Sequence, residues 1–190
     1  MPARDQVAPL LSRRDGHFAL ESGHHGDLWL DLERLFLDPG RVAPLARELA
    51  KRLERNRIEA VCGPLVEGAF VGVLVASALG VAFTYSAHEG PFRYRIPDAL
   101  RAELAGRRVA VVNDVINAGS AVIGTLDDLE ACGARPVAIA TLAILGDAAR
   151  RFAEARSLAI ATLASFPNTL WEPASCPLCA RGVALSNGAS

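Results

Sequence analysis

The sequence has no apolar run close to the roughly 20 residues that a membrane-spanning helix needs. The longest candidate, residues 70–83, is interrupted by Gly72, Ser77 and Gly80. The formal net charge is only −1, so no field of the whole chain attracts nucleic acid. The sequence also has no internal repeat and no low-complexity tract. These absences predict a protein that binds neither a membrane nor nucleic acid.

Residues 1–16 have no long apolar stretch and no small-residue cleavage site of the kind that ends a signal peptide. Cysteine is scarce, with four in the chain. Cys62 and Cys132 lie in apolar segments, which predicts buried side chains that behave as small hydrophobic residues. We therefore expect a protein of the cytoplasm, where thiols stay reduced.

Apolar residues, by contrast, are plentiful: they make up 51% of the 190 residues, against 22% charged residues. This balance predicts one domain with a sizeable core. Five runs rich in Val, Ile and Ala do not alternate cleanly, which predicts strands buried on both faces. The predicted strands are 59–63, 81–85, 108–113, 136–142 and 157–163, and the predicted helices are 42–55, 68–79, 120–131 and 147–155. Their alternation predicts an α/β fold with a central, mostly parallel sheet flanked by helices.

The two ends of the chain lack this alternation. Residues 1–35 contain a short helical pattern and then a polar stretch rich in Gly and His, and residues 164–190 contain three prolines. We expect these ends to pack together as a small hood over a core of residues 36–163. Residues 86–105 are irregular and long for a connection between strands, which predicts a flexible loop over a site.

A polar pair follows the third predicted strand, where Asn113 and Asp114 end an apolar run. In open α/β sheets, ligands bind beyond the carboxyl ends of the strands. A carboxylate beside an amide can hydrogen-bond a vicinal diol. The pattern therefore predicts recognition of a sugar at this edge of the sheet.

Small residues come next, at Ala118, Gly119, Ser120 and Ala121, and the following helix begins there. Small side chains let backbone N–H groups close around a phosphate at a helix N-terminus, where the helix dipole favours negative charge. Asn117 and Ser120 add side-chain donors. A plain turn with Ser120 as the N-cap fits the same residues. The loop is neither a GxGxxG fingerprint nor a GKS or GKT loop.

The segment VVNDVINAGSA resembles the phosphoribosyl-pyrophosphate (PRPP) motif of type I phosphoribosyltransferases. Asp114 matches the second of two acids, Asn113 replaces the first, and Asn117 stands where Thr is usual. Gly119 and Ser120 match the phosphate loop. The resemblance implies that Asn113 and Asp114 bind the ribose hydroxyls, that residues 117–121 bind the 5′-phosphate, and that Asp114 is also a catalytic candidate.

The stretch HFALESGHHGDLWLD, residues 17–31, resembles the opening of orotate phosphoribosyltransferases. The resemblance implies that Phe18, Glu21 and Ser22 bind the base. Glu21 stands where the family has Lys, so a carboxylate would repel orotate and favours a less anionic base.

The segment VCGPLVEGA, residues 61–69, follows a predicted strand and opens a helix. The resemblance implies a pyrophosphate loop that includes Gly63, Pro64, Glu67 and Gly68 and binds through backbone amides. Glu67 stands where the family often has Gly. An ordinary strand–helix turn also accounts for the glycines and the proline.

Residues 86–105 lack some of the basic residues that orotate phosphoribosyltransferases have in the corresponding segment. Ala87 and His88 stand where orotate enzymes carry Arg and Lys. The resemblance implies that His88, Arg93 and Arg95 are catalytic candidates that would stabilise the leaving pyrophosphate across a dimer interface. Arg93 and Arg95 are equally well explained as solvated charges.

Cys176 and Cys179 form a single CxxC, and a structural zinc ion usually needs four N or S ligands. His24 and His25 are adjacent, so on a strand they point to opposite faces. We therefore predict no metal ligands in the protein. The Cys-Pro-Leu-Cys segment and Gly182 are similar to the ends of many bacterial orotate-type chains.

Taken together, the resemblance implies a type I phosphoribosyltransferase fold and a homodimer. It implies transfer of ribose 5-phosphate from PRPP to a nitrogenous base, by default orotate, in pyrimidine nucleotide synthesis. Mg²⁺ would bind through PRPP. Two alternatives remain open at this point: another base, and a regulatory protein that binds PRPP without catalysis.

Overall fold

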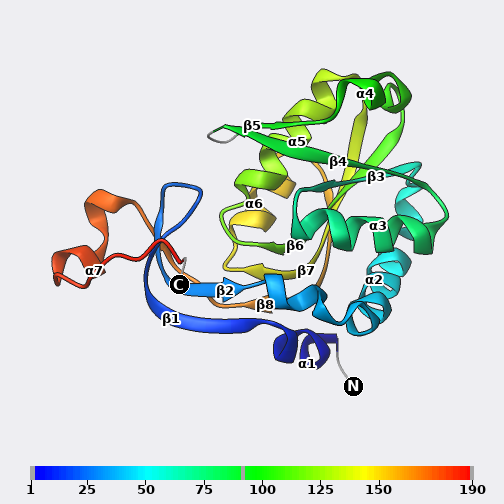
Figure 1. Cartoon of the computed structure of the whole chain (residues 1–190). Helices are drawn as coiled ribbons and strands as arrows, with labels where there is room; N and C mark the ends of the chain where they lie inside the picture. The colour runs from blue at the N-terminus through cyan, green and yellow to red at the C-terminus, as the bar shows by residue number, and fades with distance from the viewer. Residues whose placement is uncertain (1–2, 91–92, 189–190) are drawn as a thin grey trace.

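The computed structural model describes residues 3–90 and 93–188 (Figure 1). The elements in chain order are α1 (Ala3–Val7), η1 (Ala8–Leu10), β1 (Ser12–Ala19), β2 (His25–Asp31), η2 (Glu33–Leu37), α2 (Pro39–Leu53), η3 (Glu54–Asn56), β3 (Ala60–Pro64), α3 (Glu67–Leu79), β4 (Ala82–Gly90), β5 (Arg93–Arg95), α4 (Asp98–Leu104), β6 (Arg108–Ile116), α5 (Ser120–Ala131), β7 (Arg135–Leu145), α6 (Ala148–Ala155), β8 (Ala159–Phe166), β9 (Leu170–Trp171), η4 (Pro173–Ser175) and α7 (Pro177–Ala180).

The central sheet has the strand order β5-β4-β3-β6-β7-β8. Neighbouring strands from β4 to β8 are parallel, and β5 at the edge is antiparallel to β4. In β6, Val109 and Val111 join the apolar cluster on one face, while Ala110 and Val112 join the cluster on the other. Both faces are therefore buried, which is why the strand has an unbroken apolar sequence.

Helices cover both faces of this sheet (Figure 1). The helices α1, α2 and α3 contribute to one apolar cluster, and α4, α5 and α6 contribute to the other. The five strands and four helices predicted from the apolar patterns are all confirmed, with α5 at the predicted bounds. β6 and β7 each run about three residues further than predicted, and the two strands stay paired as far as Ile116 opposite Ile144.

A second, antiparallel sheet joins the two ends of the chain in the order β1-β2-β9. The chain then returns along β1, where the N–H of Ser186 donates to the carbonyl oxygen of His17 and the N–H of Ala19 donates to that of Ser186, both at 2.8 Å. The name hood is used below for residues 12–31 and 170–188, a smaller set than the predicted 1–35 and 164–190, because Val7 of α1 belongs to an apolar cluster of the central sheet and β8 extends to Phe166. In Figure 1 the hood lies to the left of and below the central sheet.

The structure corrects the irregular stretch predicted at residues 86–105. Its described part is regular: β4 extends to Gly90, β5 returns along it, and α4 follows. Residues 91 and 92 lie outside the described part of the chain. The β-hairpin was not predicted because this stretch has no aliphatic run: its cross-strand partners, such as His88 opposite Tyr94, are polar or aromatic. In the described ranges, no helix combines the length and apolarity needed to cross a bilayer.

Candidate functional site

The β3–α3 loop, the β6–α5 turn, Tyr94 of β5 and the hood surround a cavity of about 300 Å³ at the carboxyl edge of the central sheet. Most of the side chains predicted for the site line it. The lining residues are Leu20, Glu21, Ser22, Leu28, Trp29, Leu30, Leu32, Pro64, Leu65, Val66, Glu67, Gly68, Tyr94, Asn113, Asp114, Val115, Ile116, Asn117, Ala118, Gly119, Ser120, Ala121, Val122 and Leu145. Segments that are far apart in the sequence therefore meet at the edge where an open α/β sheet binds its ligands.

The turn between β6 and α5 presents the start of a helix to the cavity. Gly119, rather than Ser120, occupies the N-cap position, and no side chain in the described residues caps the helix. Gly119 has φ +92°, and a Cβ there would lie 2.5 Å from Cε1 of Phe152. The positive φ favours glycine at this position, and a Cβ would displace the ring of Phe152. The first N–H groups of α5 are thus left for a ligand, and a phosphate suits them by charge and hydrogen bonding.

Asp114 lines the cavity and is buried, with 5% of its surface exposed. Burial raises the pKa of its carboxyl to about 7, and the neighbouring charge of Glu67 acts in the same direction. The hydroxyl of Thr141 donates to the carbonyl oxygen of Asp114 at 2.8 Å and fixes the backbone there. Asn113 is held by its own amide, which donates to the carbonyl oxygen of Val115 at 2.8 Å.

The loop between β3 and α3 forms the opposite wall. A Cβ on Gly68 would collide with the side-chain oxygen of Asn113, so the two predicted loops touch at this glycine. A Cβ on Gly63 would lie 2.7 Å from the Cα of Ala69, which places Gly63 behind the wall rather than in the lining. The peptide bond between Leu65 and Val66 is cis. The predicted loop is therefore confirmed as a neighbour of the β6–α5 turn.

The hood closes the cavity with Glu21, Ser22 and Trp29. The hydroxyl of Tyr94, in β5, donates to Oε1 of Glu21 at 2.8 Å, and Nε2 of His88 lies 3.7 Å from the same oxygen. Burial is the largest cause that raises the pKa of Tyr94, and the hydrogen bond to Glu21 and the charge of that carboxylate raise it further. Glu21 therefore connects the hood to the β4–β5 hairpin.

Phe18 does not reach the cavity. It is buried at 5% exposure and its ring lies 5.7 Å from that of Trp29, centroid to centroid. Trp29 lines the cavity in its place. Phe18 is therefore a packing partner of Trp29 rather than a lining residue.

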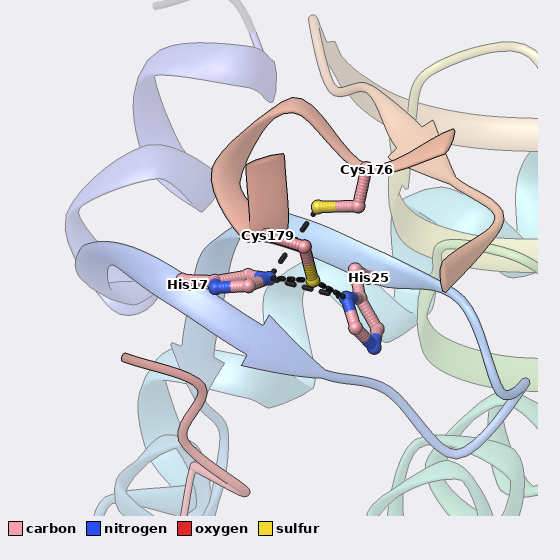
Figure 2. A group of neighbouring side chains, drawn as sticks. All are labelled: His17, His25, Cys176 and Cys179. Carbon is pink, nitrogen blue, oxygen red and sulfur yellow. Dashed lines mark hydrogen bonds between the residues drawn. The ribbon is translucent and has the colours of Figure 1, made fainter. Parts of the chain in front are cut away.

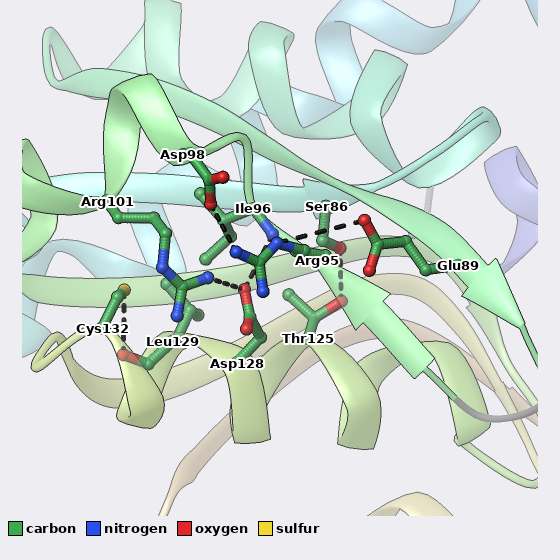
Figure 3. Close-up of polar contacts among 10 residues, drawn as sticks. All are labelled: Ser86, Glu89, Arg95, Ile96, Asp98, Arg101, Thr125, Asp128, Leu129 and Cys132. Carbon is green, nitrogen blue, oxygen red and sulfur yellow. Dashed lines mark hydrogen bonds and ion pairs between the residues drawn. The ribbon is translucent and has the colours of Figure 1, made fainter.

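The structure also places the two predicted catalytic arginines away from the cavity. Arg93 and Arg95 flank Tyr94 on β5, so they lie on the other face of the hairpin. There they border a hollow together with Asp128 of α5. Arg95 donates to Asp98 at 2.5 Å, and Figure 3 shows it among carboxylates of α4, α5 and β4. Of the three predicted cations of this stretch, His88 alone lies on the side of Glu21.

Carboxylates dominate the charge of the cavity. Glu21, Glu67 and Asp114 line it, and no Lys or Arg of the described residues does. Asn117 is positioned by Asn168, which donates to Oδ1 of Asn117 at 2.7 Å. An anionic ligand in this cavity would meet backbone amides and side-chain amides, but no fixed cation.

The structure gives the Cys pair partners that the sequence did not predict. Cys176 and Cys179 lie against His17 and His25, and the four potential ligand atoms are within 4.8 Å of one another. His25 points into this group, whereas His24 pairs with Glu172. The sequence signal that was missed is the pair of histidines eight residues apart, because no spacing rule links them to a distant CxxC.

Comparisons with known proteins agree with this architecture. No family model matches the chain. An orotate phosphoribosyltransferase from a Nitratiruptor species is 32% identical over 178 residues, which cover 88% of this chain and 87% of that protein.

Two solved structures share the fold. The orotate phosphoribosyltransferase of Mycobacterium tuberculosis H37Rv, in complex with Fe(III) dicitrate, has a TM-score of 0.67 at 21% identity, over 87% of this chain and 97% of that one. The adenine phosphoribosyltransferase of Thermoanaerobacter pseudethanolicus has a TM-score of 0.67 at 20% identity, over 85% and 99%. The predicted type I phosphoribosyltransferase fold is confirmed, and the chain belongs to the orotate phosphoribosyltransferase family.

Proposed function

We propose that this protein transfers ribose 5-phosphate from PRPP to orotate and so forms orotidine 5′-phosphate and pyrophosphate. The observation that carries the proposal is the joint placement of Asp114, the uncapped start of α5 and the Gly68 loop around one cavity. These are the three parts that a phosphorylated sugar with a diphosphate leaving group needs. Membership of the orotate phosphoribosyltransferase family then supports orotate as the acceptor.

The chain's own residues divide the work by chemistry. The N–H groups at the start of α5 bind the 5′-phosphate, helped by Ser120 and by Asn117. Asp114, once ionised, accepts hydrogen bonds from ribose hydroxyls, and Asn113 lies next to it. The backbone amides of Val66, Glu67 and Gly68, which line the cavity, would bind the pyrophosphate. The protein acts chiefly by positioning the reactants and by electrostatic stabilisation of a positively charged ribosyl centre.

The donor set fits a magnesium ion carried by PRPP. Glu67 and Asp114 offer carboxylate oxygens in a cavity that no Lys or Arg of the described residues lines, and Mg²⁺ prefers such oxygens together with phosphate oxygens and water. Bound there, the ion would neutralise the departing pyrophosphate. Glu67 and Asp114 are the residues that would hold it.

A second candidate is transfer to a base that carries N–H donors and no carboxylate. Glu21 favours it, because its carboxylate lines the cavity and is held there by Tyr94 and faced by His88. An anionic orotate would meet this charge, whereas a neutral base can donate to it. Protonated His88 would reduce the repulsion and so favours orotate instead.

We also propose a homodimer. Phe70 and Val73, on the outer side of α3, are 46% and 44% exposed, and Leu65 and Val66 continue this apolar surface. A helix that is apolar nearly all round is normally buried, so a second copy is the natural cover. Light scattering should give twice the mass of one chain, and a monomer for Phe70→Glu. We also propose a cytoplasmic location, because the four cysteines are free thiols and thiols stay reduced in the cytoplasm.

The test is pyrophosphate release from PRPP and Mg²⁺ with orotate and with a panel of purine and pyrimidine bases. Release with orotate supports the first proposal, and release with a neutral base alone supports the second. Asp114→Ala should abolish release and the thermal stabilisation by PRPP. Asp98→Ala, an exposed carboxylate outside the cavity, is the matched control. Stabilisation by PRPP without release from any base would overturn both proposals in favour of a regulatory protein.

A further inference from the structure

Four side chains from distant parts of the chain converge in the hood (Figure 2). His17 lies in β1, His25 begins β2, Cys176 immediately precedes α7, and Cys179 lies in α7. Nε2 of His17 lies 3.1 Å from Nδ1 of His25 and 3.4 Å from Sγ of Cys176. Nδ1 of His25 lies 3.3 Å from Sγ of Cys179.

These distances match the edges of a tetrahedron around one ion. With Zn–N of about 2.0–2.1 Å and Zn–S of about 2.3 Å, ligand atoms lie roughly 3.3–3.8 Å apart. Sγ of Cys179 is 3.7 Å from Nε2 of His17, and all pairs lie within 4.8 Å. The four atoms therefore face one point that each can reach.

Hydrogen bonds among the four groups do not account for the arrangement. Nδ1 of His17 lies 2.8 Å from the carbonyl oxygen of Val183, which can only accept, so Nδ1 carries the proton. Nε2 of the neutral ring then has a single lone pair, and three potential ligand atoms surround it. A cation at the centre satisfies all four groups. The contact to Val183 also orients the ring, as outer partners of metal-bound histidines do.

The C-terminal segment has no other core. Of the described residues from 172 to 188, none belongs to either apolar cluster of the protein. Its buried side chain is Cys176, at 3% exposure, next to His17 at 3% and His25 at 8%. Small segments without enough apolar burial are commonly held by a metal ion or disulfides, and these thiols are free.

We propose that His17, His25, Cys176 and Cys179 bind one Zn²⁺ ion that ties the C-terminal segment to the strands of the hood. Two imidazoles and two thiolates in tetrahedral array suit Zn²⁺. All four positions are filled by the protein, so the site is structural rather than catalytic. It does not depend on the reaction proposed above.

The ion would also fix one wall of the cavity. His17, near the end of β1, and His25, at the start of β2, lie at the two ends of a segment that contributes Leu20, Glu21 and Ser22 to the lining. Tying these ends to α7 limits the movement of the segment. The site is therefore a structural support for the part of the cavity that meets the base.

Metal analysis of the protein, purified without chelators, tests the proposal. We expect close to one zinc per chain in the wild type, and at most about a tenth of that in Cys179→Ser, whose side chain is accessible enough for the substitution to be tolerated. Cys132→Ser and His24→Gln are matched controls outside the cluster and should keep the full zinc content. Removal of zinc from the wild type by a chelator should lower the melting temperature by on the order of 10 °C, and added Zn²⁺ should restore it.

A second measurement guards against misfolded variants. Wild-type protein freed of zinc and given Co²⁺ should show thiolate-to-cobalt charge-transfer absorption, which Cys132→Ser should retain and Cys179→Ser should lose. Wild-type protein that holds no zinc and takes up no Co²⁺ overturns the proposal. So does zinc that stays at the wild-type level in Cys176→Ser and Cys179→Ser, or a disulfide between these two residues in the protein as isolated.

Discussion

The central sheet and the hood are held together by different physics. The sheet has apolar clusters on both faces, with strands such as β6 and β7 buried almost throughout. The hood has three strands, and its buried side chains include His17, His25 and Cys176 beside Phe18 and Leu28. The first region is stabilised by apolar burial, and the second depends on backbone pairing and on its polar cluster.

The cavity lies where these two regions meet. The sheet supplies Asp114 and the start of α5, and the hood supplies Glu21 and Trp29. The part that would bind the sugar phosphate is thus built on the rigid region, and the part that would meet the base is built on the other. This division lets the hood change with the substrate while the phosphate site keeps its geometry.

The largest expected effect comes from the core of the sheet. Ile139→Ala removes a fully buried side chain from β7, so it should lower the free energy of unfolding by about 2–5 kcal/mol. Because the sheet supports the hood, amide exchange should speed up in both regions. Urea unfolding and hydrogen exchange measure the two effects.

Zinc removal is the matching perturbation of the hood. It should speed amide exchange in residues 12–31 and 170–188 and leave β6 and β7 protected. Equal acceleration in both regions would show that the hood and the sheet unfold as one unit, and the contrast between them would not hold.

Asp114 is a residue of the site whose burial lowers the stability of the folded protein at neutral pH. Its pKa is about 7 in the folded protein against an ordinary value of 3.8, so the native state holds the proton more tightly between these values. Stability should therefore fall as the pH rises from about 4 to 7, by up to about 4 kcal/mol. Asp114→Asn should remove this fall. PRPP binding should show the opposite trend and strengthen as the carboxyl ionises.

Urea unfolding of wild type and Asp114→Asn at several pH values isolates the contribution of this carboxyl from those of the four histidines. Parallel stability curves for the two proteins would mean that Asp114 titrates normally.

The sheet was predictable from the sequence because the apolar pattern of each strand and helix indicates which of its faces are buried. An apolar run such as residues 108–112 needs both faces covered, and the small residues 118–121 mark the start of the helix at 120–131. The Asp114 turn was found for the same reason: strand, loop and helix are adjacent in the chain.

The hood was not predictable in this way. β1 and β2 are mostly polar, β9 has two residues, and their pairing joins segments about 145 residues apart. The His and Cys side chains that meet in the hood are 154 to 162 residues apart, so no local pattern marks them. Arg93 and Arg95 lie outside this chain's own cavity because alternate side chains of β5 face opposite sides of the hairpin, so their role across a dimer interface stays a prediction.

Substitutions at Gly119 and Gly133, at the two ends of α5, distinguish the cost of side-chain crowding from the cost of backbone strain. Both have positive φ, +92° and +77°, but only at Gly119 would a Cβ collide, with Phe152; at Gly133 the nearest atom is 3.9 Å away. Gly133→Ala should cost about 1 kcal/mol, and Gly119→Ala about 1–3 kcal/mol with loss of PRPP binding. Thermal unfolding with and without PRPP measures both. Equal losses of stability would mean that Phe152 moves aside.

The smallest expected effect is at the contact that joins the two regions. Tyr94→Phe keeps the ring and removes the hydroxyl that donates to Glu21 at 2.8 Å, so stability should fall by only about 1 kcal/mol. Without this hydrogen bond, the Glu21 carboxylate would repel the anionic orotate more strongly. We expect the KM for orotate to rise while the Kd for PRPP stays the same, because the phosphate site belongs to the sheet. Tyr85→Phe, on β4 outside the cavity lining, is the control. A parallel change in PRPP affinity would show that the hood and the sheet form a single binding unit.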